Sequence, residues 1–300
     1  MPVTHDVPVP SRVVASLVVL AAAALFGTTG TSLALLTPGA PGAGVAAMRL
    51  LVGGAGLVAV AVWRREHREL AVLWRRPLIW AMAACVAGYQ AFFFIATART
   101  GVALAALLAL GVAPVLSGLL GWLSGAGAPG WIWAVSTALA IAGLSMLISG
   151  SVTEGDGWGM AAACLAGAAY AGYTVLGVRL TRAGAAPGTV LAASFSVAAV
   201  LLIPAAVSSL WWMSTTGVIE VLWLGIMTTT VAYLLFGVGL RVLQPGHIAT
   251  LTLVEPAVAT TLAVLVLGER LTWLGGLGCL VIGVALAVLA ASERTRRPVA

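Results

Sequence analysis

Long apolar runs, separated by short polar connectors, fill almost the whole chain. An apolar helix needs about 20 residues to cross the roughly 30 Å hydrocarbon core of a membrane. Measured against this length, the pattern predicts ten membrane-spanning helices at 12–36, 41–63, 77–98, 101–123, 131–150, 157–178, 187–210, 218–240, 245–267 and 272–291. The connectors carry helix-interrupting glycines and prolines, as in TPGAPG and GAGAPG. No segment alternates polar and apolar residues as a β-barrel wall does, so the pattern predicts an all-α polytopic membrane protein.

Composition supports a membrane protein and argues against several other classes. Of the 300 residues, 61% are hydrophobic and 8% are charged, whereas a soluble domain is about a quarter charged. The net charge of +6 does not indicate nucleic-acid binding, because the charges lie in gaps between apolar runs rather than on one face. The three cysteines are scattered through apolar runs without a CxxC pair, which indicates neither a disulfide framework nor a metal site. The first apolar run is too long for a signal peptide, so we expect it to stay as a helix.

The distribution of arginine predicts how the chain lies in the membrane. All fifteen basic residues are arginines. With the N-terminus placed in the cytoplasm, twelve lie on that side: Arg12, Arg64, Arg65, Arg68, Arg75, Arg76, Arg179, Arg182, Arg241, Arg294, Arg296 and Arg297. The opposite side holds Arg99 and Arg270. Because basic residues concentrate in cytoplasmic connectors, we expect a multi-pass protein of the bacterial inner membrane with both termini in the cytoplasm.

A weak internal repeat relates the two halves of the chain. When the first half is slid along the second by 142 residues, Arg99 falls on Arg241 and Pro114 on Pro256. Each half has five predicted helices, an odd number, so the halves must insert with opposite orientations. We therefore expect one five-helix repeat at 1–150, after a short cytoplasmic tail, and an inverted repeat at 151–300 with a basic cytoplasmic tail. Many secondary transporters have this architecture, with the substrate bound near the midplane between the halves.

The penultimate predicted helix carries a pattern that resembles a known family. The run at 239–272 has an arginine before a short break, then L-x-E-P at Leu253–Pro256 and LGERL at 267–271. It resembles the corresponding helix of the EamA-type, ten-helix members of the drug/metabolite transporter superfamily. The first half departs from this pattern, because Ala113 stands where the second half has Glu255. The chain length and the aromatic third span are most similar to bacterial exporters of amino acids, including aromatic ones.

Glu255 and Pro256 stand in an otherwise apolar run. A carboxylate near the centre of a membrane helix costs roughly 2.5–3.5 kcal/mol on insertion scales and usually faces the bundle interior or water. Proline lacks an N–H, so we expect Pro256 to leave the carbonyl of Thr252 unpaired and to bend the helix. The aligned Pro114 predicts the same break in the first half. In one interpretation Glu255 binds a substrate amine or exchanges a proton; in the other it is a structural tie to an arginine or to a helix end.

Arg49 is the second charge that the predicted spans place inside the membrane. Three interpretations stay open for it. It binds a substrate carboxylate in bidentate fashion, it is the structural partner of Glu255, or its long stem snorkels outward.

The stretch YQAFFF at 89–94 is the densest aromatic stretch of the chain. A site for a flat or apolar side chain needs such a wall with a few polar groups, although an aromatic run can equally be core or face lipid. We expect one central cavity between spans 1, 3, 6, 8 and 9. Its candidate substrate-binding residues are Thr28, Tyr89, Gln90, Phe93, Tyr170, Tyr173, Tyr233 and Glu255.

These features favour transport over catalysis. The sequence has no phosphate loop, H-E-x-x-H or G-x-S-x-G motif, so we expect neither an enzyme nor a cofactor. The predicted function is a secondary transporter that exports a small zwitterionic metabolite by alternating access. The alternatives are an exporter of cationic compounds and a scaffold or receptor that transports nothing. A chain with an internal repeat contains a complete pathway, so a monomer suffices, with a small-molecule substrate and the lipid bilayer as its partners.

Overall fold

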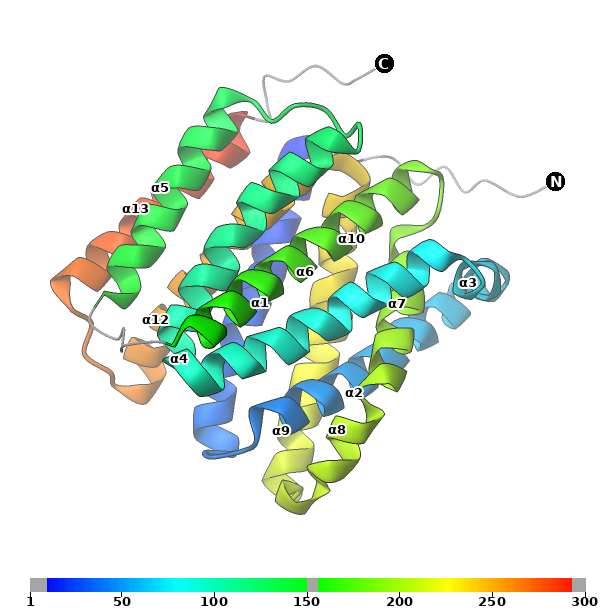
Figure 1. The fold of residues 1–300 in the computed structure, drawn as a ribbon, viewed down its shortest axis with the longest axis horizontal. Coiled ribbons are helices and arrows are strands. Elements are labelled where there is room, and N and C mark those ends of the chain that lie inside the picture. The colour runs from blue at the N-terminus through cyan, green and yellow to red at the C-terminus, as the bar shows by residue number, and fades with distance from the viewer. Residues whose placement is uncertain (1–9, 150–155, 293–300) are drawn as a thin grey trace.

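The computed structural model describes residues 10–149 and 156–292, and these residues form helices and no strand (Figure 1). This confirms the predicted all-α fold. The helices are α1 (Arg12–Leu36), α2 (Gly42–Trp63), α3 (His67–Trp74), α4 (Pro77–Leu123), α5 (Trp131–Ile148), α6 (Gly157–Arg182), α7 (Pro187–Leu201), α8 (Ile203–Ser208), η1 (Leu210–Trp212), α9 (Thr215–Gly225), the π-helical turn η2 (Ile226–Val231), α10 (Ala232–Val242), α11 (Pro245–Leu251), α12 (Val254–Leu267) and α13 (Trp273–Ser292).

Each predicted span has a helical counterpart among these elements. Eight of the described helical segments are long and apolar enough to cross a membrane, by length and composition. One of them, α4, has 47 residues and contains both predicted spans 77–98 and 101–123. The predicted span 187–210 begins as α7, which has 15 residues, and continues as the short helix α8. With the two arms of α4 counted separately and α7 included, the ten predicted spans are all present.

α4 changes direction at Gly101. This residue has φ +75° and ψ 162°, the one non-helical conformation within α4. Positive φ is readily accessible to glycine because it has no Cβ. In Figure 1 the two arms of α4 run on either side of α6, and both pack against it. Gly101 therefore makes a helical hairpin out of a continuous run of 47 residues.

The helix contacts have the pattern that a two-fold axis between the halves would produce. α6 packs between the arms of α4, and α1 packs against α10 and α12 in the corresponding way. α2 packs against α7, and α5 against α13. The division into repeats at 1–150 and 151–300 stays a prediction, because its boundary and the two predicted tails lie outside the described residues.

The prolines aligned in the two halves have different effects. At Pro256 the helix is broken as predicted: α11 ends at Leu251 and α12 begins at Val254. The carbonyl of Thr252 is nevertheless not unpaired, because the Glu255 N–H donates to it over 3.0 Å. The predicted break at Pro114 is wrong, since α4 continues through this residue in helical conformation. One proline removes a single backbone donor, and the bonds on either side can hold a packed helix together.

The short helix α3 lies in the connector after α2 and was not predicted. Two carboxylates bind it to the start of α7: Glu69 accepts the Ala186 N–H over 2.7 Å, and Glu66 accepts the Thr189 hydroxyl over 2.6 Å. The bond from Ala186 satisfies a backbone donor at the start of α7, where intrahelical acceptors are missing.

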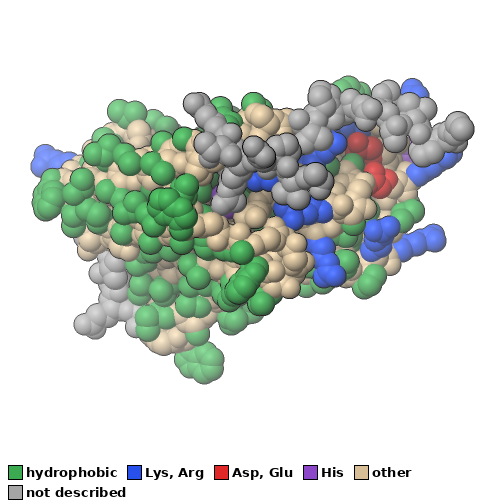
Figure 2. Space-filling model, turned by 90° about the horizontal axis from the view of Figure 1, so that it is seen from above, with side chains coloured by type: hydrophobic (Ala, Val, Ile, Leu, Met, Phe, Trp, Pro, Cys, Tyr) green, Lys and Arg blue, Asp and Glu red, His purple; other side chains and the backbone are tan. Residues whose placement is uncertain are grey.

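The surface has the character of a membrane protein. In Figure 2 the visible basic side chains gather mainly towards one end, and hydrophobic side chains cover much of the rest of that face. Tryptophans at the ends of spans project outward: Trp63, Trp131, Trp158, Trp211 and Trp273 are each at least 75% exposed. Such residues are enriched at membrane interfaces, in agreement with the predicted multi-pass arrangement.

Asp156 connects the Gly101 hairpin to the start of α6. Its carboxylate caps α6 by accepting the Gly159 N–H and forms an ion pair with Arg99 over 2.8 Å. Two hydrogen bonds lower the pKa of Asp156. The cap bond from Gly159 has the larger effect, and the bond from Arg99 has the smaller one. Both side chains of the pair are about half exposed, so the ion pair contributes little by comparison with the cap.

We predict that Asp156→Ala lowers the melting temperature more than Asp156→Asn does, because asparagine keeps the capping oxygen. A carboxyl whose pKa is lowered by folding stabilises the protein above its unfolded pKa, and this stabilisation is lost as the pH falls through its folded pKa. The difference between wild type and Asp156→Asn should therefore vanish in acid. Thermal unfolding of the three purified proteins over a pH series measures this. Equal melting of wild type and Asp156→Ala at neutral pH would contradict the capping role.

Candidate central binding site

A small cavity lies near the middle of the bundle, where α2, α4, α6, α7, η2 and α10 meet. It is lined by Arg49, Leu50, Val86, Tyr89, Gln90, Tyr173, Phe195, Thr229 and Tyr233. Five of these nine residues, namely Arg49, Tyr89, Gln90, Tyr173 and Tyr233, were predicted as site residues from the sequence. They come from positions up to 184 residues apart (49 to 233), so only the packing of the helices brings them together.

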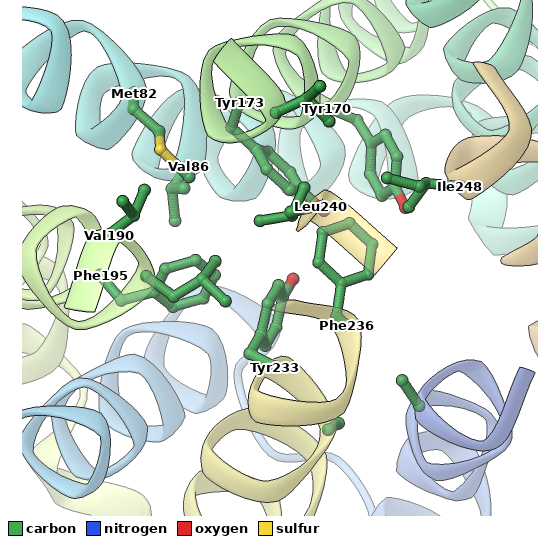
Figure 3. Packing of buried hydrophobic residues seen from close by; sticks show 14 of the residues in the cluster. Met82, Val86, Tyr170, Tyr173, Val190, Phe195, Tyr233, Phe236, Leu240 and Ile248 are labelled. Atoms are coloured by element: carbon green, nitrogen blue, oxygen red, sulfur yellow. The ribbon is translucent and has the colours of Figure 1, made fainter. Parts of the chain in front are cut away.

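All four tyrosines of the chain belong to one aromatic cluster in and around this cavity. Tyr89 contacts Tyr170 edge-to-face with ring centroids 5.9 Å apart, and Tyr170 lies 4.8 Å from Tyr173. Figure 3 shows Tyr173 and Tyr233 converging from α6 and α10. Tyr233 in turn lies 4.2 Å from Phe195 of α7, measured between ring centroids. The rings form a continuous apolar wall with hydroxyls at its edge.

The π-helical turn η2 lies in the span that supplies Tyr233. The hydroxyls of Thr229 and Thr230 donate to carbonyls five residues earlier, at Leu224 and Gly225. Thr230 also donates to the carbonyl of Gly53 on α2 over 3.2 Å. Such turns recur at functional sites because the extra residue in the turn changes the direction of the following side chains. Here the turn contributes Thr229 to the cavity and directly precedes α10, which carries Tyr233.

Two donors at the cavity have no acceptor. Arg49 Nε and Gln90 Nε2 are buried and lack a hydrogen-bond partner among the described residues. Gln90 is 5% exposed, and a buried unpaired donor costs about 1–3 kcal/mol. Of the three interpretations of Arg49, the structure argues against outward snorkelling, because the Arg49 side chain lines the cavity. A cationic and a neutral donor facing one space are suited to a carboxylate.

Glu255 lies near the aromatic cluster but does not line the cavity. It is half-buried at the start of α12, and it interacts electrostatically with Tyr89 and Tyr233, as Arg49 does. Glu255 and Arg49, both described, form no ion pair with each other. The two charges are therefore not bonded directly, but they interact through space, and both act on the same rings.

Three other predicted residues lie outside the cavity. Phe93 stacks on Tyr89 at 5.8 Å between ring centroids, and the Tyr170 hydroxyl bonds to Thr252 over 3.0 Å. Thr28 is further away: its hydroxyl donates to the Leu25 carbonyl over 2.8 Å and accepts from the indole N–H of Trp223 over 3.3 Å. Thr28 thus belongs to the contact between α1 and α9.

The sequence reading missed Phe195 and Thr229, which line the cavity. Phe195 is the one aromatic residue of α7, but nothing in its surroundings singles it out. The run of three threonines at 228–230 was a usable signal, since consecutive hydroxyls in an apolar span need acceptors. A third intramembrane charge, Glu220, was also missed, because the predicted span began two residues before it.

Buried residues and hydrogen bonds join the helices on the side of the cavity where α1 begins and α13 ends. All seven residues of α11 are buried. Thr250 on α11 shares a 2.8 Å hydrogen bond with Thr137 of α5, and Thr181 of α6 donates to the Leu240 carbonyl over 2.9 Å. The first of these bonds joins the two predicted halves, and the second joins two helices of the second half.

Comparison with known proteins agrees with this architecture. Residues 157–291 match the EamA-like transporter family. The chain is 36% identical over 286 residues to the uncharacterized transporter YwfM of Bacillus subtilis (strain 168), covering 94% of this chain and 95% of that protein. A protein of known crystal structure has the same fold, with a TM-score of 0.79 and 21% identity over 93% of this chain and 97% of its own. This chain therefore belongs to the EamA-like transporter family, and it is a membrane transporter by that membership.

Proposed function

We propose that this transporter exports small zwitterionic metabolites, amino acids including aromatic ones, across the inner membrane by alternating access. The observation that carries the proposal is the unpartnered pair of donors, Arg49 Nε and Gln90 Nε2, beside an aromatic wall. An amino acid needs a donor for its carboxylate, an acceptor for its ammonium group and an apolar surface for its side chain. Arg49 supplies the donor, Glu255 supplies the acceptor, and the tyrosine cluster supplies the apolar surface.

The location of the cavity also supports transport. Substrate sites of transporters with inverted repeats lie near the midplane, between the halves. The cavity receives residues from both predicted halves, such as Tyr89 and Tyr233, and hydrogen bonds join the helices on the side where α1 begins and α13 ends. Alternating access requires these contacts to break while others form on the opposite side.

Glu255 gives a specific reason to consider a second function. In an exporter of cationic compounds the carboxylate of Glu255 is the main binding group. A basic residue that binds a substrate carboxylate, such as Arg49, is not needed. Glu255 makes no side-chain hydrogen bond to another described residue, so it is available to a ligand. The two functions differ in which charge they require.

Counterflow in proteoliposomes tests both functions. Vesicles loaded with one unlabelled compound are diluted into the same compound in labelled form, for a panel of amino acids and of organic cations, with and without a pH gradient. We expect exchange of amino acids, strongest for apolar and aromatic side chains, and none in protein-free vesicles. We also expect Glu255→Gln to lose most of this exchange, because its neutral amide attracts an ammonium group less than a carboxylate does.

The other outcomes are equally informative. Exchange of cations but not of amino acids would support the second function and contradict the first. Exchange of no compound in the panel would favour a scaffold or receptor. If Glu255→Gln exchanges amino acids like wild type at every pH, Glu255 is structural.

A further inference from the structure

Glu220 is a buried carboxyl group away from the cavity. It lies in the second turn of α9 and is 0% exposed. Burying an ionised carboxylate in an apolar bundle is costly unless a cation or several donors compensate it. The residues around Glu220 therefore determine whether it carries a charge.

No basic group lies close to Glu220 in the described chain. The helices packed against α9 are α1, α2 and η2, and the neighbouring 203–214 segment has no charged residue. In α1 the one charged residue is Arg12, about 30 Å along the helix from Ser32. In α2 it is Arg49, whose side chain faces the cavity with Thr229, and neither arginine is among the groups that act on the Glu220 carboxyl. η2 has no titratable residue.

The contacts of Glu220 suit a neutral acid. Ser32 Oγ lies 2.9 Å from Glu220 Oε1 and 3.1 Å from the Thr29 carbonyl oxygen. A serine hydroxyl has one proton, and a carbonyl can only accept. If Glu220 carries a proton, it donates to Ser32 and Ser32 donates to Thr29, so each contact has its own proton; beside an ionised Glu220 the one Ser32 proton is shared between two acceptors. Oε2 has no partner among the described residues, a smaller cost for a neutral acid than for an anion.

Ser32 belongs to the α1–α9 contact that Thr28 and Trp223 also form. We propose that Glu220 is a proton-binding site: its carboxyl holds a proton while α1 and α9 are in contact, and releases it to water when they separate. The proton passes from Oε1 to a water molecule and leaves the carboxylate solvated. If the chain transports as proposed above, this exchange would link substrate movement to a proton gradient.

Infrared difference spectra of the purified protein in lipid test the site without any substrate. The carbonyl stretch of a protonated carboxyl is distinct from that of a carboxylate. We expect a protonated-carboxyl band at neutral pH that is absent from Glu220→Gln and unchanged in Glu269→Gln, a control in an exposed connector. Glutamine can also donate to Ser32, so Glu220→Gln should elute and melt like wild type.

Ser32→Ala gives an independent check if Glu220→Gln fails to fold. It should shift the band, because the acid loses its hydrogen-bond acceptor. The proposal is overturned if the band of wild type is unchanged in those of the two variants that fold. It is also overturned if the band disappears in Glu269→Gln.

A transport measurement then tests the link to the gradient, and this arm alone rests on the proposed function. For any amino acid that shows counterflow, Glu220→Gln should keep exchange but lose accumulation driven by a pH gradient. Retained gradient-driven accumulation would overturn the link. Absence of all transport would contradict the proposed function and leave the infrared result standing.

Discussion

Arg49→Met is expected to weaken binding of a zwitterionic amino acid by roughly 10- to 150-fold. A hydrogen bond to a charged group contributes about 1.5–3 kcal/mol, and each 1.4 kcal/mol is tenfold in affinity. Arg49→Lys should fall between wild type and Arg49→Met, since lysine keeps the charge but not the planar bidentate geometry. Tryptophan fluorescence titration, with the amino acid that exchanges best in counterflow, measures these affinities.

The control for Arg49 is the stability of the free protein. Arg49 Nε has no partner in the described structure, so Arg49→Met breaks no bond at that atom, and the loss of the through-space attraction to Glu255 should change the melting temperature little. A decarboxylated analogue of the same amino acid should bind wild type and Arg49→Met alike. Unchanged amino acid affinity in Arg49→Met, or a large loss of stability, would assign Arg49 a structural role instead.

Gly278→Leu is expected to prevent stable folding, because it separates α5 from α13. A Cβ on Gly278 would lie 2.5 Å from the Gly143 carbonyl oxygen and 2.8 Å from the Leu147 nitrogen. Both are backbone atoms and cannot rotate away. Overpacking in a core typically costs about 1–3 kcal/mol, and a clash with backbone should cost more because the whole helix must move.

Gly283→Leu on the same helix is the matched control. A Cβ there meets no heavy atom within 4 Å, and leucine forms helices more readily than glycine. Size-exclusion chromatography and thermal unfolding in detergent should show a native-like Gly283→Leu and an aggregated or strongly destabilised Gly278→Leu. If both variants melt like wild type, the close approach of α5 and α13 does not hold the bundle together.

The helix break at Pro256 illustrates where sequence reasoning succeeds and where it stops. The missing N–H of proline is a local property, so the interruption before residue 256 was predictable. Whether a helix then opens depends on the bonds and packing around it. α4 passes through Pro114 without interruption. At Thr252, by contrast, the carbonyl accepts from the N–H three residues later instead of four. The internal alignment of the two prolines could not distinguish these outcomes.

Thr28 and Glu220 show the same limit at the level of side chains. Both lie on apolar helices, where the sequence gives the residue type but not the direction in which it points. The structure removes Thr28 from the cavity and places it with Ser32 and Glu220 in the α1–α9 contact. Glu220 stands near the edge of a predicted span and was not considered as a buried charge, although this helix begins three residues earlier than predicted.

The sequence by itself determined that the chain is a helical membrane protein, the approximate limits of its ten spans, and the aromatic and charged residues available for a site. These follow from local properties, because the length and hydropathy of a segment decide whether it can cross a bilayer. Only the tertiary structure decided that four tyrosines meet around one cavity, that Arg49 faces it with an Nε that has no partner among the described residues, and that Glu220 is buried against Ser32. Those facts depend on how distant helices pack and rotate, which no local pattern specifies.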